Sequence, residues 1–221
     1  MRITRLVAGS VTAGLIGLTP IAIAAPTQAA VTYTTSAVAA PSETRVVYGD
    51  ALTVDVDIDS SQGFAPPGGT TTLLAQEVGS TTFVPVATSD GAYAYFTDVK
   101  PAAGTTYKAS YSGFTASNGD IYQPTESATF TVEVARKITY PSSGFVIKGK
   151  VTPDYAKKKI VIKVSRKQNK GYKSFKTIKT TSAGKYKITL PRRGGTWYWS
   201  FVIKGDDKYL ANGFVWKTFV G

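Results

Sequence analysis

The positions of apolar and polar residues after residue 30 predict short β-strands. Residues 52–59, LTVDVDID, alternate strictly, so that four aliphatic side chains lie on one face and Thr53 and three aspartates on the other. Residues 159–164, KIVIKV, and 186–190, YKITL, alternate in the same way. Turn pairs separate the runs, at Gly68-Gly69, Asp90-Gly91, Lys170-Gly171 and Gly194-Gly195. No stretch sustains a helical period, and strands with one polar face predict an all-β protein made of antiparallel sandwiches.

The same order of motifs occurs in both halves of the chain. The first half reads DGAYAYF at 90–96, KPAAGTTYKASY at 100–111 and GDIYQP at 119–124. The second half reads AGKYKITL at 183–190, LPRRGGTWYWSF at 190–201 and GDDKYLAN at 205–212. The prolines of the middle motif, Pro101 and Pro191, are 90 positions apart. This internal repeat predicts two copies of one module.

Charge distinguishes the two copies sharply. Residues 31–135 contain 3 basic and 11 acidic residues, a net charge of −8. Residues 136–221 contain 21 basic and 3 acidic residues, a net charge of +18. The net charge of +12 for the whole chain therefore conceals an acidic copy followed by a basic one.

The motifs of both copies resemble one known family. FVIKGKVTP, KKKIVIKVSRK and SFKTIKTTSAGKYKITLPRRGGTWYWSF resemble the bacterial Ig-like repeat domains of exported actinobacterial surface proteins, and VVYGDALTVDVDI and PAAGTTYKASY look like a second, more acidic member. The resemblance implies two tandem Ig-like antiparallel β-sandwich domains, an acidic one at 44–135 and a basic one at 136–221. We expect a flexible segment at 31–43. Such modules serve as spacers, adhesion units and wall-associated domains.

The first thirty residues predict export. Arg2 and Arg5 precede an uncharged, mostly apolar run that ends near Leu18, and small residues follow it. This order is typical of a signal peptide at 1–30, cleaved near Ala29 or Ala30. The apolar run is shorter than the roughly 20 residues that span a bilayer. We therefore expect a secreted or cell-surface protein with no transmembrane segment in its mature chain.

The composition argues against catalysis and against a bound cofactor or metal. The chain has no His and no Cys, so a Ser-His-acid triad, a thiol nucleophile and a typical zinc site are all excluded. Asp55, Asp57 and Asp59 are a candidate carboxylate group. Because they occupy alternate positions of one strand, we expect them on a flat, solvated face, where they form neither a glycosidase pair nor a calcium site.

The basic copy holds the candidate binding residues. In FVIKGKV, at 145–151, Lys148 and Lys150 point outward if the apolar residues point inward, and in GKYKITL the same holds for Lys185 and Lys187. In an Ig-like sandwich these runs are the adjacent B and E strands, so the four lysines share one face. Lysine outnumbers arginine 17 to 4 in this half, which favours diffuse attraction to a polyanion over sequence-specific reading of a nucleic acid.

A second candidate lies in RRGGTWYWSF, residues 192–201. Strand alternation buries Trp197, Trp199 and Phe201 and leaves Tyr198 exposed beside Arg192 and Arg193. The complete candidate polyanion-binding set is Lys148, Lys150, Lys185, Lys187, Arg192, Arg193 and Tyr198.

Two hypotheses of function remain open. In the first, a non-enzymatic module of the cell envelope or extracellular space attaches through its basic domain to a polyanion such as a wall polymer. In the second, the chain is a structural spacer or a self-assembling surface protein whose charges govern solubility and packing. Self-association between the acidic domain of one molecule and the basic domain of another belongs to the second hypothesis, and pairing of the two domains within one chain is equally open.

Overall fold

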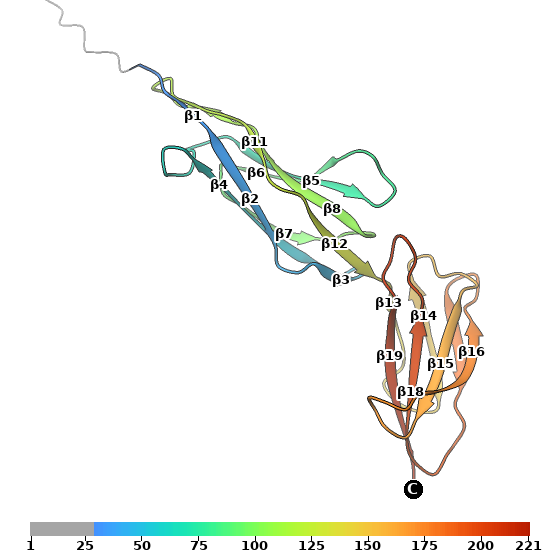
Figure 1. Cartoon of the computed structure of the whole chain (residues 1–221). Coiled ribbons are helices and arrows are strands. Elements are labelled where there is room, and N and C mark those ends of the chain that lie inside the picture. The colour runs from blue at the N-terminus through green and yellow to red at the C-terminus, as the bar shows by residue number, and fades with distance from the viewer. Residues whose placement is uncertain (1–28) are drawn as a thin grey trace, which may run out of the picture.

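The chain folds into two elongated β-sandwiches joined end to end with a bend between them (Figure 1). The computed structural model describes residues 29–221, so the predicted signal peptide lies outside the described residues apart from Ala29 and Ala30. All regular elements of residues 29–221 are strands, as the alternation predicted.

The acidic domain consists of two facing sheets and a small third sheet. One sheet has the order β2 (Thr35–Pro41), β4 (Leu52–Ser60), β7 (Ala94–Val99). The facing sheet has the order β3 (Arg45–Val47), β12 (Phe130–Ala135), β8 (Thr105–Tyr111), β5 (Thr70–Glu77), β6 (Val84–Asp90), and β11 (Thr125–Glu126) also pairs with β8. The third sheet joins β1 (Thr32–Tyr33), β10 (Ile121–Tyr122) and β9 (Phe114–Thr115). All pairs are antiparallel except β3 with β12 and β1 with β10.

The prediction of a flexible segment at residues 31–43 is wrong. Residues 32–33 form β1, and residues 35–41 form β2, which pairs along its whole length with β4. Alternate residues of β2 are half-buried, and Ala37 and Ala39 pack against the core of the acidic domain. The small side chains of this segment hid its periodicity, because alanine and threonine give a weak apolar signal. The acidic domain therefore begins near residue 31.

The basic domain repeats the two-sheet plan with fewer strands. One sheet has the order β13 (Lys137–Ile138), β14 (Val146–Thr152), β17 (Lys185–Thr189). The other has the order β16 (Lys173–Lys179), β15 (Lys159–Ser165), β18 (Gly195–Ile203), β19 (Asn212–Val220). All its pairs are antiparallel, and Ile147, Ile162 and Trp199 lie fully buried between the sheets. The predicted strands at 159–164 and 186–190 are confirmed, with β17 ending one residue earlier.

A single residue, Arg136, connects the last strand of the acidic domain to the first strand of the basic one. Its side chain is buried, although arginine is rarely buried without a partner. The Nε group donates to the Pro153 carbonyl at 2.9 Å, Nη2 donates to Asp206 Oδ2 at 2.7 Å, and the guanidinium lies 4.2 Å from the ring centre of Tyr209. These contacts hold the connector against the basic domain.

The loop between β18 and β19 contacts the acidic domain directly. The Leu210 amide donates to the Val134 carbonyl at 2.8 Å, and the Gly104 amide donates to the Lys208 carbonyl at 3.0 Å. Tyr209, from the basic domain, packs into the hydrophobic cluster of the acidic domain. The GDDKY motif, which helped reveal the repeat, therefore forms part of the joint between the domains.

Candidate polyanion-binding surface

The four lysines predicted to share a face lie together on β14 and β17. In the register of these antiparallel strands, Lys148 is directly opposite Lys187, and Lys150 is directly opposite Lys185. All four are exposed, while Ile147 and Ile188 on the same strands point into the core. We call these four residues the lysine ladder.

The lysine ladder surrounds a depression of about 630 Å³. Lys179, Thr139 and Thr181 also line it, so five ammonium groups converge on one surface. Gly149, between Lys148 and Lys150, permits the close approach of the chain at Thr139, because a Cβ at position 149 would overlap the Thr139 carbonyl. Burial raises the pKa of Tyr186, whose hydroxyl donates to this same carbonyl at 2.9 Å. These contacts fix the strand that borders the ladder.

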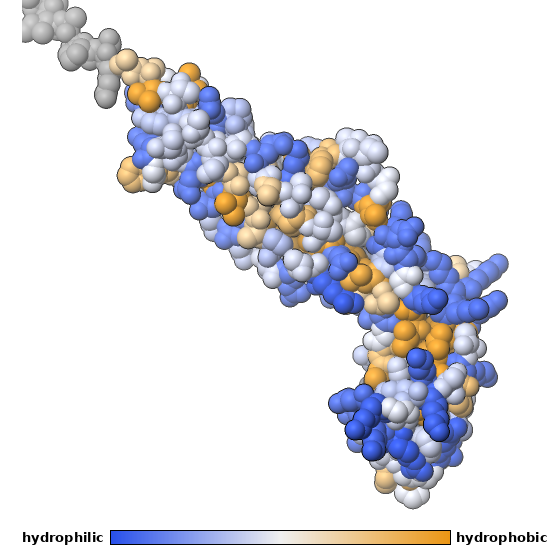
Figure 2. Space-filling model, in the orientation of Figure 1, coloured by the Kyte–Doolittle hydropathy of each residue, from blue (hydrophilic) through white to orange (hydrophobic). Residues whose placement is uncertain are grey.

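No acidic side chain of the described residues pairs with the lysine ladder. The basic domain has three acids, Asp154, Asp206 and Asp207, and all three lie in loops at the joint. Asp206 Oδ2 forms ion pairs with both Arg136 Nη2, at 2.7 Å, and Lys158 Nζ, at 3.0 Å. Hydrophilic side chains cover much of the basic domain around an apolar patch near the joint (Figure 2). Like charges directly opposite one another on a sheet are destabilising, and here nothing among residues 29–221 offsets them.

The remaining three residues of the candidate set lie outside the ladder, and they do not form one group: the adjacent Arg192 and Arg193 contact different aromatic rings, and Tyr198 lies on β18. The exposed Arg192 has its guanidinium 5.2 Å from the ring centre of Phe145. Tyr198 is half-buried on β18, opposite Lys217 of β19 and Ser165 of β15, and therefore belongs to the other sheet. The structure thus divides the predicted set and does not form one continuous surface from it.

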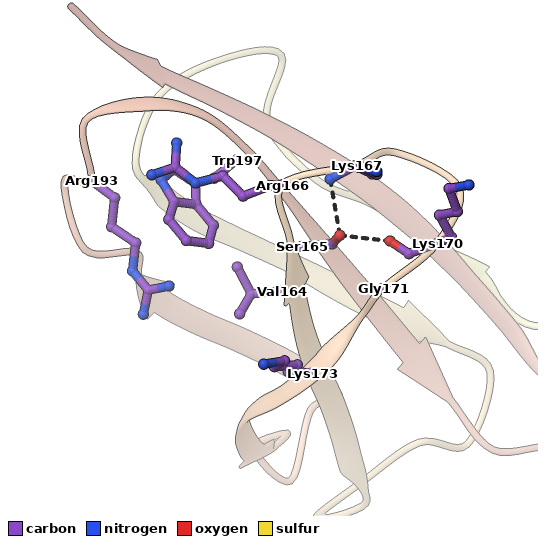
Figure 3. A pocket seen from close by; sticks show the side chains of 9 residues that line it. All are labelled: Val164, Ser165, Arg166, Lys167, Lys170, Gly171, Lys173, Arg193 and Trp197. Carbon is purple, nitrogen blue, oxygen red and sulfur yellow. Dashed lines mark hydrogen bonds between the residues drawn. The ribbon is translucent and has the colours of Figure 1, made fainter.

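Arg193 instead lines a second hollow, at the end of the basic domain far from the joint. This hollow, of about 540 Å³, is lined by Val164, Ser165, Arg166, Lys167, Lys170, Gly171, Lys173, Arg193 and Trp197 (Figure 3). Its basic residues come mainly from the β15–β16 turn. The sequence predicts this segment as a turn but not as part of a binding site. The density of positive charge in SRKQNKGYK, residues 165–173, was the signal that could have identified it.

The prediction that Trp197 is a core residue is only partly correct. Trp199 and Phe201 are buried as expected, but Trp197 is half-buried and packs at the margin of the core. Near the start of β18 the opposite sheet has already ended, since β17 stops at Thr189. The indole is covered instead by arginine, with the guanidiniums of Arg166 and Arg193 at 4.0 and 4.7 Å from its ring.

The three aspartates of the acidic face, Asp55, Asp57 and Asp59, lie on the solvent side of β4. Among residues 29–221 no group of three or more His, Cys, Asp or Glu side chains is arranged to hold a metal ion. Within the same residues no helix has the length and apolar character needed to cross a membrane.

The strand order defines the class of the protein as two tandem Ig-like β-sandwich domains. No protein-family model and no curated protein matches the chain. Among solved structures, it is similar to a segment of two fibronectin type III domains from chicken tenascin, at 12% identity over 81% of this chain and 97% of that one, with a TM-score of 0.39. It is also similar to the human OSCAR ligand-binding domain, at 16% identity over 83% and 97% of the chains, with a TM-score of 0.30. The fibronectin(III)-like modules of CbhA from Clostridium thermocellum are 13% identical over 83% and 94%, with a TM-score of 0.25.

Proposed function

We propose that the chain is an exported, non-enzymatic binding module that attaches through the lysine ladder to an extracellular polyanion such as a wall polymer. The observation that carries this proposal is the pair of directly opposed lysines, Lys148 with Lys187 and Lys150 with Lys185, which no acid of the described residues neutralises. A polymer with closely spaced anionic groups would relieve the repulsion within the ladder.

The physical basis of this attachment is the release of counterions. Lysine ammonium groups are flexible point charges that attract an anionic polymer without selecting one bond geometry. Displacement of the polymer's condensed counterions makes the affinity fall steeply as salt rises. The ladder therefore favours wall polymers and acidic polysaccharides over a ligand whose individual groups must be recognised by bonds of fixed geometry.

The proposal is tested on residues 31–221 with the four ladder lysines replaced by serine. A matched control replaces four exposed lysines of the other sheet, Lys159, Lys163, Lys176 and Lys217, so that both variants lose the same charge. Retention on purified cell wall and on soluble polyphosphate is measured over a salt series. We expect the ladder variant to lose most of its retention and the control to lose little. Equal losses, or no retention of the unaltered chain at low salt, would refute the ladder as the binding site.

A second candidate function, end-to-end self-assembly, is supported by the charges at the two outer ends of the molecule. The loops at the free end of the acidic domain lie near Asp59, Asp90 and Asp120 and include no basic residue between residues 59 and 70, 89 and 93, or 112 and 125. The free end of the basic domain carries Arg166, Lys167, Lys170, Lys173, Arg192 and Arg193 and no acidic side chain. Head-to-tail contact of these ends would propagate a chain.

Self-assembly is tested by sedimentation velocity at low and high salt. Replacement of Asp59, Asp90 and Asp120 by asparagine should abolish any concentration-dependent association, because it removes the negative end. A monomer at every concentration in low salt rules out this function and leaves attachment through the ladder unaffected.

A further inference from the structure

We propose that the hollow beside Trp197 binds a single carboxylate-bearing sugar unit, of the uronic acid type. This hollow is distinct from the lysine ladder and differs from it in chemistry. The ladder presents only lysines, whereas the hollow combines two arginines with an aromatic ring and the aliphatic side chain of Val164. Small-molecule sites are typically concave, partly apolar and equipped with a few converging polar groups, and the volume of about 540 Å³ lies within their range.

Arg193 is the principal anion-binding group of this site. Its half-buried side chain is held by three aromatic rings, with its guanidinium 4.7 Å from Trp197, 5.3 Å from Trp199 and 5.7 Å from Phe175. It makes no hydrogen bond and no ion pair with any residue from 29 to 221. Stacking fixes a guanidinium through its faces and leaves its N–H groups, which lie in the plane, free to donate. A planar carboxylate can accept two such bonds at once.

Arg166 and Trp197 form a wall next to Arg193, with the Arg166 guanidinium 4.0 Å from the ring centre of Trp197. The Arg166 Nη1 group and the Trp197 Nε1 group both donate to the Gly194 carbonyl, at 3.0 and 3.2 Å. Gly195 has a φ of 75°, a left-handed backbone conformation that favours glycine, and a Cβ at this position would lie 2.8 Å from Arg166 Nη1. The two hydrogen bonds to one carbonyl place both side chains beside Arg193.

The opposite rim of the hollow is a closed turn. The Ser165 hydroxyl donates to the Lys170 carbonyl at 2.6 Å and accepts from the Lys167 amide at 2.9 Å (Figure 3). These bonds hold Lys167 and Lys170 at the edge of the hollow. In Figure 3 the Arg193 guanidinium, the Trp197 ring and Val164 lie around the same space.

These features favour a sugar acid as the ligand. The indole and Val164 offer an apolar surface for the C–H groups of a sugar ring, and the arginine fork matches a carboxylate. No carboxylate of residues 29–221 lines the hollow, so an anionic ligand meets no repulsion there. The rim lysines would attract neighbouring acidic units of the same polymer.

The test measures binding of trigalacturonate to residues 31–221 by isothermal titration calorimetry, with its fully methyl-esterified form and glucose 6-phosphate as comparison ligands. The unaltered protein should bind trigalacturonate at least tenfold more tightly than either comparison ligand. Arg193→Lys keeps the charge but loses the planar fork, and should weaken binding at least tenfold. Arg192→Lys is the matched control, because this neighbouring arginine does not line the hollow, and should bind as the unaltered protein does.

Each other result overturns the proposal. Equal binding of the methyl ester excludes carboxylate recognition, and equal binding of glucose 6-phosphate excludes selection of a sugar acid. Unchanged binding by both Arg193→Lys and Arg166→Lys excludes the arginine site. The serine variant of the lysine ladder should keep the trigalacturonate binding that depends on Arg193 while losing retention on the wall, so failure of this site and failure of the proposed function are distinguished.

Discussion

The outer faces of the strand pairs β4–β7 and β14–β17 differ between the two domains, although their inner faces are alike. In the acidic domain β4 and β7 place Asp55 opposite Tyr95, whereas in the basic domain β14 and β17 place Lys148 opposite Lys187. On the inner faces both pairs bury aliphatic side chains, such as Val56 and Ile147. The interior is constrained by packing, and the exterior is free to carry any charge that the fold's stability can tolerate.

The two cores also differ in their aromatic residues. All three tryptophans of the chain lie in the basic domain, at positions 197, 199 and 216. Where the repeat places Ala109 in the acidic domain, the basic domain has Trp199, which is 0% exposed. Its Nε1 group donates to Thr218 Oγ1 at 2.9 Å. Tryptophan fluorescence consequently reports on the basic domain alone, which allows the two domains to be followed separately.

The largest expected effect comes from removal of this core tryptophan. Trp199→Ala should lower the free energy of unfolding of the basic domain by about 3–5 kcal/mol, because it leaves a cavity and removes the partner of the Thr218 hydroxyl. The measurement is urea unfolding followed by the emission of Trp197 and Trp216. Val202→Ala, an exposed position of the same strand, is the control and should change stability by less than about 0.5 kcal/mol. A loss below about 1 kcal/mol would show that the core of the basic domain does not depend on Trp199.

The next effect concerns Asp206, the shared partner of Arg136 and Lys158. Partial burial raises the pKa of Asp206, but the hydrogen bonds from Arg136 and Lys158 outweigh it and lower the pKa from 3.8 to about 2. Because the folded pKa is the lower one, the stabilisation is present above pH 4 and is lost as the pH falls toward 2. Asp206→Asn should cost roughly 1–2 kcal/mol at pH 7, a value reduced by the partial exposure of this side chain.

The pH dependence separates this contribution from the titration of other acids. Thermal unfolding of the basic domain is followed by tryptophan emission at pH 7, 4 and 2. The unaltered protein should lose more of its stability between pH 4 and pH 2 than Asp206→Asn does. Asp207→Asn, at the neighbouring position, should behave as the unaltered protein. If Asp206→Asn shows the same acid sensitivity as the unaltered protein, the ion pair at the joint does not contribute as described.

The architecture was predictable because it depends on local alternation. Residues 52–59 and 159–164 read as strands from their period alone, and both are strands with the predicted faces buried. Residues 35–41 were missed since alanine and threonine give no strong contrast between faces. The role of Arg136 was not visible either, because its burial depends on Asp206 and Tyr209, some 70 positions away in the sequence.

The candidate site was predictable where it depends on a strand pair and unpredictable where it depends on loops. That the four ladder lysines share one face follows from the adjacent B and E strands of an Ig-like sandwich, whereas the register that sets Lys148 opposite Lys187 comes from the structure. The contact of Arg166 with Trp197 joins two turns whose relative position no periodicity encodes. Alternation assigned Trp197 to the core correctly by face, but it could not show that the opposite sheet ends before reaching this residue.

A smaller effect is expected from reversal of one charge in the lysine ladder. Lys148→Asp places a carboxylate opposite Lys187 and should stabilise the basic domain by about 0.5–1 kcal/mol, because a repulsive cross-strand pair becomes an attractive one. Thermal unfolding at low salt measures this gain, which should largely disappear at 1 M salt as the charges are screened. Lys217→Asp, opposite Tyr198 on the other sheet, controls for the change in net charge. An equal gain in this control would attribute the effect to net charge and not to the ladder.

The smallest effect tests the acidic counterpart of the ladder. The nearby carboxylate of Asp55 is the largest of the influences that raise the pKa of Tyr93 above 10.0, since it opposes ionisation of the phenol. Asp55→Asn should therefore move the pKa of Tyr93 back toward 10, as measured by an NMR titration of its ring. Asp59→Asn, four residues further along β4 on the same face, should leave the pKa of Tyr93 unchanged. A Tyr93 titration that is insensitive to Asp55 would mean that the acidic face lacks the electrostatic coupling that we expect of the lysine ladder, and the two faces would then differ in organisation as well as in sign.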